Sequence, residues 1–194
     1  MELNILIKGL LMNNIYLSGF GIKLSPLTAD KLELVRSWRN HIDVAQYMVD
    51  QSHISVNQQR IWFASLEEKV DQLHLLISYK GENIGVINAK TLDGLSLNNS
   101  QVISPGLYLS PQSKYRNSIL AFSPSLVFID YLFSLEKSQT LLAQVLPENT
   151  NAIRYNQTLG YTKQSVDHQG IVTMQLLLAD FELAKIKLAK ILRF

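Results

Sequence analysis

Hydrophobic and polar positions alternate with two different periods along the chain, and the changes between them predict where strands and helices lie. Alternation at every second position predicts strands over residues 15–24, 73–79 and 83–89. Apolar positions spaced by three and four predict helices over residues 28–38 and 55–69. The first half of the chain is therefore expected to form a strand, two helices and a pair of strands.

Polar residues at the starts of the two helices can cap them. Thr28 and Ser55 are typical N-cap residues, whose side-chain oxygen accepts a hydrogen bond from a free backbone amide. Gly81, between the two later strands, favours a hairpin turn. The inward faces of the two helices are expected to consist of Leu32, Leu34, Val35 and Trp38, and of Ile61, Trp62, Ala64 and Leu66.

The second half alternates strands with helices. Ser123 as N-cap and Pro124 at the first helical position begin a buried helix. A helix of about three turns follows Pro147 and ends at Gly160, which is a typical C-cap residue. Strands are predicted over residues 102–109, 141–146 and 172–178, and the other helices over residues 124–135 and 181–192.

Pro105 interrupts one of these strands. Because proline donates no backbone hydrogen bond, it favours a bulge or a strand edge at this position. A strand that begins only at Gly106 is the alternative.

Composition narrows the classes of function. The chain has 194 residues, is 47% hydrophobic and carries a net charge of +2, so it is long enough for a substantial core and too weakly basic to predict nucleic-acid binding. It contains no cysteine, which excludes disulfides and thiolate chemistry and fits a cytoplasmic location. Its four histidines are not spaced as a metal site. No apolar stretch approaches the roughly 18 residues that cross a bilayer.

Two segments carry a more specific signal. Residues 148–161 contain Glu-Asn-x-x-Ala and end in Leu-Gly-Tyr, and residues 37–48 contain Trp-Arg-Asn-His followed by Tyr-Met. An ordinary strand–helix connection capped by glycine also accounts for the first segment. Together, the segments resemble the GCN5-related N-acetyltransferase (GNAT) superfamily. The second resembles a subgroup that includes the acetyltransferase of pseudaminic acid biosynthesis, which acetylates a UDP-linked amino sugar.

The resemblance, which extends from about Leu24 to about Tyr161, implies a fold. The expected class is α/β (α+β), with a mixed central sheet of about seven strands that is splayed in the middle and flanked by about four helices. A single GNAT domain would cover residues 1–194. Within it, residues 1–14 would form an extra strand or a leader, and residues 180–194 would form an amphipathic C-terminal helix.

The same resemblance implies acetyl-CoA as a co-substrate, bound between a strand and the loop that follows it. Ile119 stands where the family pattern has glycine, so it is expected to crowd or shift the phosphate-binding loop. A register that starts at Gln112 fits the pattern less well. Without the resemblance, this segment is a polar loop before a core helix. The implied cofactor-binding residues are Leu107, Tyr108, Leu109, Tyr115, Arg116, Asn117, Ser118, Ile119, Leu120, Ala121, Asn149 and Ala152.

Amide formation from a thioester requires a base for the amine and a donor for the leaving thiolate. Glu148, His41 and His53 are the candidate bases, although a histidine in a loop is often only a polar residue. The family places a tyrosine donor where this chain has Asn156. Tyr155, one residue earlier, is either a donor from an irregular helix or a core aromatic. The catalytic candidates are therefore Glu148, Tyr155, Asn156 and His41.

The Trp-Arg-Asn-His segment is expected to contact the acceptor. An arginine fork suits a diphosphate, and aromatic rings can stack on a uracil or a sugar. The alternative is the C-terminus of a helix, with Asn40 as its cap and Trp38 in the core. The implied substrate-binding residues are Trp38, Arg39, Asn40, His41, Tyr47, Met48 and His53.

Three functions follow from these observations. The first is an N-acetyltransferase acting on a nucleotide-linked amino sugar in surface polysaccharide biosynthesis. The second is a protein or peptide N-acetyltransferase of the ribosomal-protein type. The third is a non-catalytic GNAT binding module, suggested by Ile119 and Asn156. For the first function the partner is a small molecule, with no nucleic acid and no membrane span, and a homodimer is left open.

Overall fold

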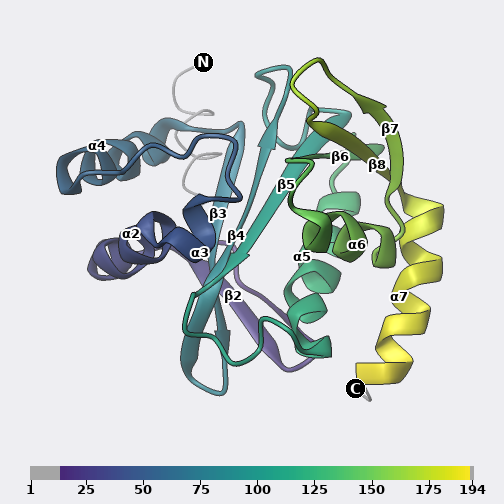
Figure 1. Cartoon of the computed structure of the whole chain (residues 1–194), viewed down its shortest axis with the longest axis horizontal. Helices are drawn as coiled ribbons and strands as arrows, with labels where there is room; N and C mark the ends of the chain where they lie inside the picture. Colours follow the sequence, from purple (N-terminus) through teal and green to yellow (C-terminus); the bar gives the residue numbers. More distant parts are fainter. Residues whose placement is uncertain (1–13, 193–194) are drawn as a thin grey trace.

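The computed structural model describes residues 14–192 and contains one eight-stranded sheet with helices on both faces (Figure 1). The strand order is β1-β2-β3-β4-β5-β6-β8-β7. Neighbouring strands are antiparallel except β5 and β6, which are parallel. The extra strand or leader expected over residues 1–14 falls almost entirely outside the described residues.

The first predicted strand is in fact a hairpin. Residues 15–24 were expected to be continuous, but β1 ends at Gly19 and β2 begins at Ile22 because Phe20 and Gly21 turn the chain with φ of 48° and 77°. The next two strands and their turn at Gly81 agree with the prediction. The four strands are β1 (Leu17–Gly19), β2 (Ile22–Pro26), β3 (Gln72–Tyr79) and β4 (Glu82–Thr91).

The helix predicted from Thr28 starts differently from expectation. A short 3-10 helix, η1 (Ala29–Lys31), precedes α2 (Leu32–Asn40). The Thr28 hydroxyl caps no backbone amide; it donates to the Asp30 carboxylate at 2.6 Å. A further short helix, α3 (Ile42–Ala45), was not predicted.

The second predicted helix is divided into α4 (Val56–Ser65) and the 3-10 helix η2 (Leu66–Glu68). Ser55 forms the expected N-cap, within a full capping box with Gln58. The expected apolar face was only partly right. Ile61 is 63% exposed, whereas Gln59 is buried. Trp62 does pack inward as expected: its ring meets the His74 ring edge-on at 4.9 Å. Burial lowers the pKa of His74 to about 4.

The second half forms the elements that the sequence predicted, with three differences. The helix expected to begin at Ser123 is preceded by a 3-10 helix, so Phe122 is the N-cap and the buried Ser123 hydroxyl caps nothing. The fully exposed strand β7 was missed, and β5 contains no bulge at Pro105. The elements are β5 (Val102–Leu109), η3 (Ile119–Phe122), α5 (Ser123–Phe133), β6 (Thr140–Val145), α6 (Thr150–Thr158), β7 (Thr162–Val166), β8 (Val172–Leu177) and α7 (Leu178–Leu192).

The regular register at Pro105 has a simple geometric reason. The Ser110 amide donates to the Ile84 carbonyl in β4, so the alternation of an antiparallel ladder directs the amides of Tyr108 and Gly106 to the same side. The backbone nitrogen of residue 105 therefore faces away from β4. Because it makes no bond to β4 in any case, a proline there costs the β4–β5 ladder no hydrogen bond. The strand therefore begins at Val102, not at Gly106.

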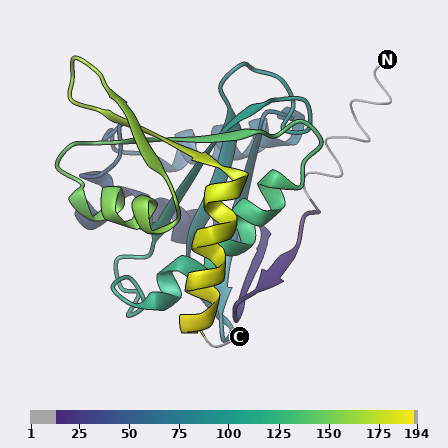
Figure 2. The same cartoon turned by 90° about the vertical axis from the view of Figure 1, so that its right-hand side faces the viewer.

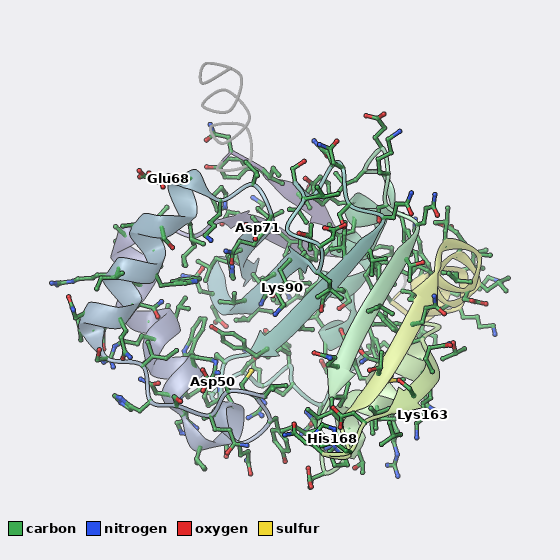
Figure 3. All side chains as sticks on the ribbon, turned by 90° about the horizontal axis from the view of Figure 1, so that it is seen from above. Asp50, Glu68, Asp71, Lys90, Lys163 and His168 are labelled. Atoms are coloured by element: carbon green, nitrogen blue, oxygen red, sulfur yellow. The ribbon has the colours of Figure 1, made fainter. Side chains whose placement is uncertain are left out.

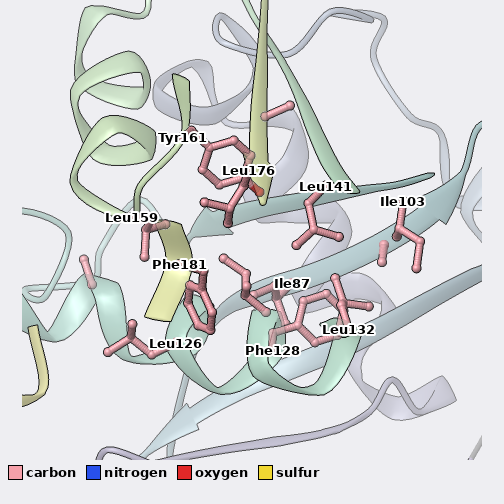
Figure 4. Close-up of a cluster of buried hydrophobic side chains, with 14 of the residues drawn as sticks. Ile87, Ile103, Leu126, Phe128, Leu132, Leu141, Leu159, Tyr161, Leu176 and Phe181 are labelled. Atoms are coloured by element: carbon pink, nitrogen blue, oxygen red, sulfur yellow. The ribbon is translucent and has the colours of Figure 1, made fainter. Parts of the chain in front are cut away.

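Two hydrophobic clusters lie on the two faces of the sheet. Leu76 and Val86 point toward α2 and α4, where they pack with Trp38. The larger cluster lies on the opposite face, under α5 and α7, and is shown in Figure 4. Its side chains with no or almost no exposed surface include Leu75, Ile77, Ile87, Ile103, Leu126, Phe128, Leu132, Leu141, Leu176 and Phe181.

The C-terminal helix α7 closes the larger cluster. It runs in front of α5 in the view of Figure 2. Phe181 is fully buried and its ring lies 6.0 Å from that of Phe133 in α5, and Lys185 pairs with Asp130. The amphipathic helix expected over residues 180–194 is therefore present and begins two residues earlier, at Leu178.

Two residues on α7 provide a test of this packing. Phe181→Ala should lower the free energy of unfolding by about 3–5 kcal/mol, because it removes a fully buried aromatic side chain. Leu183→Ala, on the same helix but 62% exposed, should change it by less than about 0.5 kcal/mol. Urea unfolding of both variants measures the difference, and equal losses would contradict the packing of α7.

Candidate active site

The sheet opens between its two parallel strands. β5 and β6 pair only at Val102 with Thr140 and at Ile103 with Leu141, and beyond these pairs the strands separate. Because the β4-facing amides of β5 belong to residues 106 and 108, those of Leu107 and Leu109 are directed into the opening. Unpaired backbone groups of this kind can bind an extended ligand as an additional strand would.

A cleft of about 590 Å³ occupies this opening. One wall consists of β5 and of side chains from β4, and another consists of β6 and the start of α6. The remaining walls come from α2, α3, the loop after β5 and α5. The predicted site residues that line it are Arg39, Tyr47, Met48, Leu107, Tyr108, Leu109, Arg116, Asn117, Ala121, Asn149, Ala152, Tyr155 and Asn156.

The loop between β5 and η3 brings one predicted cofactor residue across the cleft. The Arg116 guanidinium donates from Nη2 to the Asp43 carbonyl at 3.1 Å, and its Nη1 lies 3.6 Å from the Asp43 carboxylate. Tyr115 points elsewhere and packs edge-on against Tyr79 at 5.0 Å.

The residue expected to crowd this loop does not enter the cleft. Ile119, which stands where the family has glycine, is 39% exposed and is not among the lining residues. Ser118 and Leu120 also lie outside the lining; Ser118 accepts the Ala121 amide through its carbonyl, and Leu120 is buried in the core.

Helix α6 is regular, and Asn149 caps it by accepting the Ala152 amide at 3.1 Å. Tyr155 lines the cleft, but its hydroxyl is already engaged. It donates to the Ala121 carbonyl at 3.0 Å, so the Ser125 hydroxyl, 2.8 Å away, must be the donor to Tyr155. Burial raises the pKa of Tyr155 far above its usual value, and the Ser125 hydrogen bond offsets only part of this effect.

The neighbouring position, Asn156, also lines the cleft. Its amide nitrogen lies 3.8 Å from the Met174 sulfur, which is a weak acceptor. Tyr161 forms part of the same wall, and burial strongly raises the pKa of its hydroxyl. Glu148 is exposed just before α6 and does not line the cleft.

Arg39 is held on the opposite side of the cleft by α2. Its Nη2 donates to the Asp50 carbonyl, whereas its Nη1 is buried without a hydrogen-bond partner. Tyr108 lies on the same side; burial raises the pKa of its hydroxyl, and the charge of Arg39 opposes that effect. A buried, unpaired guanidinium nitrogen in a cleft wall is suited to an anionic ligand.

Four other residues of the predicted acceptor site stabilise the fold around α2 and α3 and do not face the cleft. Trp38 is buried in the smaller core cluster, as the alternative reading expected. Asn40 ties the end of α2 to Ile54 through two hydrogen bonds of 2.8 Å and lies 3.3 Å from a His53 ring nitrogen. His41 caps α3 by accepting the Asp43 amide at 3.2 Å. None of Trp38, Asn40, His41 and His53 lines the cleft.

The sequence missed many of the lining residues, among them a cluster of Asn88, Lys90 and Gly106 on neighbouring strands. Asn88 and Lys90 in β4 share a face with Gly106 in β5, and the Asn88 carboxamide lies where a side chain at 106 would be, 3.0 Å from an ideal Cβ. In the view from above, Lys90 lies on the α4 side of β5, far from Lys163 and His168 near β7 and β8 (Figure 3). Only the pairing of the strands reveals this cluster.

The charges around the cleft favour an anionic ligand. Arg39, Lys90 and Arg116 line it, and Asp43 is the only carboxylate among the described lining residues. Across residues 14–192, no three His, Cys, Asp or Glu side chains come together as a metal site. No helix of the described chain is long and apolar enough to cross a membrane.

Comparison with known proteins agrees with this architecture. No family model matches the chain. It is similar to acetyltransferase PseH of Campylobacter jejuni serotype O:2, with 26% identity over 136 residues that cover 70% of this chain and 80% of that protein. PseH of C. jejuni serotype O:23/36 is 27% identical over the same coverage. The resemblance found in the sequence is confirmed.

Solved structures share the fold at lower identity. Aminoglycoside acetyltransferase AAC(6')-Ib in complex with coenzyme A superposes with a TM-score of 0.70 and 17% identity, covering 84% of this chain and 98% of that one. The chain has the GNAT fold. Spermidine N-acetyltransferase from Vibrio cholerae, in complex with CoA and spermine, gives a TM-score of 0.71 and 12% identity, covering 84% and 99%. This GNAT sheet has eight strands where about seven were expected, and its described residues form six α-helices where about four were expected.

The hydroxyl of Tyr155 should contribute to stability. Tyr155→Phe leaves the Ala121 carbonyl and the Ser125 hydroxyl without their partner, so it should lower the free energy of unfolding by about 1–3 kcal/mol. Tyr16→Phe, at a position that is 70% exposed, is the matched control and should have almost no effect. Urea unfolding compares them, and a neutral Tyr155→Phe would show that the hydrogen bonds do not form in solution.

Proposed function

We propose that this protein is an N-acetyltransferase that moves the acetyl group of acetyl-CoA to the amine of a nucleotide-linked amino sugar. Acetyl-CoA-dependent N-acetyl transfer is supported by the GNAT fold, by the cleft and by the coenzyme A complexes of the structural relatives. The nucleotide-linked acceptor is the finer part of the proposal. It is supported by the similarity to PseH and by the charges of the cleft.

The observation that carries the proposal is the opening between β5 and β6. The amides of Leu107 and Leu109 can bind the extended arm of the cofactor, and one of them can also stabilise the thioester carbonyl. Arg116 and Asn117, at the end of the cleft formed by the loop after β5, would bind the phosphates. When bound, acetyl-CoA supplies an activated acyl group, so the chain mainly has to align the amine with it.

The acceptor would enter from the side of α2 and α3. The unpaired Nη1 of Arg39 and the ammonium of Lys90 suit the phosphates of a nucleotide, and Tyr47 offers a ring for stacking. Asn88, whose carboxamide makes no hydrogen bond to another described side chain, can bind the sugar. In surface polysaccharide biosynthesis such a sugar nucleotide would be found in the cytoplasm, so we predict a cytoplasmic location for the protein. That the protein forms a homodimer is also a prediction.

Removal of the proton from the acceptor amine would depend on groups that do not line the cleft. Neither histidine nor glutamate is among the described residues that line the cleft. Glu148, exposed in the loop between β6 and α6, would therefore act through water, and His41 or His53 would need the chain to rearrange. Asn156 is better placed than Tyr155 to donate a hydrogen bond to the thiolate, because the hydroxyl hydrogen of Tyr155 already bonds to the Ala121 carbonyl.

Cofactor binding is the first test of the proposal. Acetyl-CoA at about 100 times its Kd should add about 2.7 kcal/mol to the free energy of unfolding. Calorimetry and thermal unfolding measure this effect. No binding at millimolar acetyl-CoA would favour the non-catalytic module.

The acceptor class is tested by kinetics with matched substrates. A UDP-linked amino sugar should be acetylated efficiently and the free amino sugar poorly, because nucleotide contacts position the amine. Equal efficiency with the free sugar would remove the nucleotide from the proposal. Activity on protein N-termini alone would support the peptide N-acetyltransferase.

Arg39 allows a sharper test, with Arg36 as its control. Arg39→Lys should raise the KM for the UDP-linked amino sugar by about tenfold or more, since a hydrogen bond to a charged group contributes about 1.5–3 kcal/mol, and should leave the acetyl-CoA affinity unchanged. Arg36 also donates to a backbone carbonyl of the following loop, that of Ile54, but does not line the cleft. Arg36→Lys should leave both constants unchanged, and an equal effect of the two variants would contradict the role of Arg39.

A further inference from the structure

The Arg116 side chain connects the loop after β5 with the acceptor side of the cleft. Arg116 belongs to the loop after β5, and both of its contacts at the cleft are made to Asp43 in α3, 73 positions earlier in the chain. One contact is to the Asp43 backbone carbonyl and the other to its carboxylate. The loop that would bind cofactor phosphates is thus tied to the helix that borders the acceptor side.

The carboxylate is in an unfavourable place for an anionic ligand. A phosphate that approaches the Arg116 guanidinium also approaches Asp43, the only carboxylate among the described lining residues. Like charges at short distance repel, and a half-exposed pair such as this one is weak enough to be exchanged for another partner. The guanidinium has five N–H donors in all, so Arg116 can release the carboxylate and donate to a phosphate without leaving the cleft.

We propose that Asp43 is a positioning residue that holds Arg116 across the cleft in the free protein and that cofactor phosphates displace its carboxylate from the guanidinium. This inference rests on the proposed binding of acetyl-CoA. Val44, Tyr47 and Met48 follow Asp43 and line the same cleft, so release of Asp43 changes the anchoring of the acceptor-side wall.

The sign of a substitution distinguishes this role from a structural one. Asp43→Asn keeps the backbone carbonyl contact and removes the charge, so it should bind coenzyme A about two- to fivefold more tightly than the wild type, the range expected for an exposed ion pair. A residue that merely supports the fold would weaken binding or leave it unchanged when substituted. Asp30→Asn, which removes the same charge outside the cleft, should leave the affinity unchanged.

Two further measurements test the route through Arg116. Acetylpantetheine has the thioester arm of the cofactor without its phosphates, and Asp43→Asn should not change its affinity. In an Arg116→Gln background, Asp43→Asn should no longer strengthen coenzyme A binding. Calorimetry with both ligands on the wild type, the three single variants and the double variant provides every comparison.

The possible outcomes are distinct. Tighter binding of coenzyme A alone, lost without Arg116, supports the proposal. Unchanged or weaker binding in Asp43→Asn, or a gain that persists with acetylpantetheine or in the Arg116→Gln background, overturns it while the acetyltransferase proposal stands. Failure of the wild type itself to bind coenzyme A would instead reject the proposed function.

Discussion

The arrangement of the site depends on the loss of strand pairing between β5 and β6 after two residue pairs. Backbone amides and carbonyls inside a protein need partners, so a sheet that opens in its middle must present these groups to water or to a ligand. The eight-stranded sheet supports the opening with antiparallel pairs on both sides, and α5 connects the two diverging strands. A rigid frame therefore holds a short stretch of unpaired backbone in place.

The residues of β5 are suited to this position. Pro105 has no amide hydrogen, and it occupies a position that faces away from β4, where it disrupts no pairing. Gly106 follows, and its missing side chain leaves room for the Asn88 carboxamide. Leu107 then directs its amide into the opening while its side chain packs on the larger cluster. Pro105 thus leaves the β4–β5 ladder intact, Gly106 leaves space beside Asn88, and Leu107 provides a free backbone donor.

Local signals in the sequence were sufficient for much of this fold. α6 was predicted with its glycine end because capping and period are local properties, and Gly160 has a φ of 99°. The buried face of α4 could not be predicted in full, since Gln59 is a polar residue and is nevertheless buried. Asn88 and Lys90 escaped notice because strand pairing places them beside Gly106, and no spacing in the sequence records it.

Tyr155 shows how a family pattern and the local physics of one chain can diverge. Its ring stacks on Phe122 with centroids 4.5 Å apart, and its hydroxyl joins α6 to the start of α5. A phenol has one proton, so donation to the Ala121 carbonyl leaves none for a thiolate unless that bond breaks. Breaking it would leave a buried carbonyl unpaired, whereas the weak contact of Asn156 with the Met174 sulfur is easily exchanged. In the proposed reaction, Asn156 would therefore stabilise the leaving thiolate with a hydrogen bond more readily than Tyr155, and water would supply the proton.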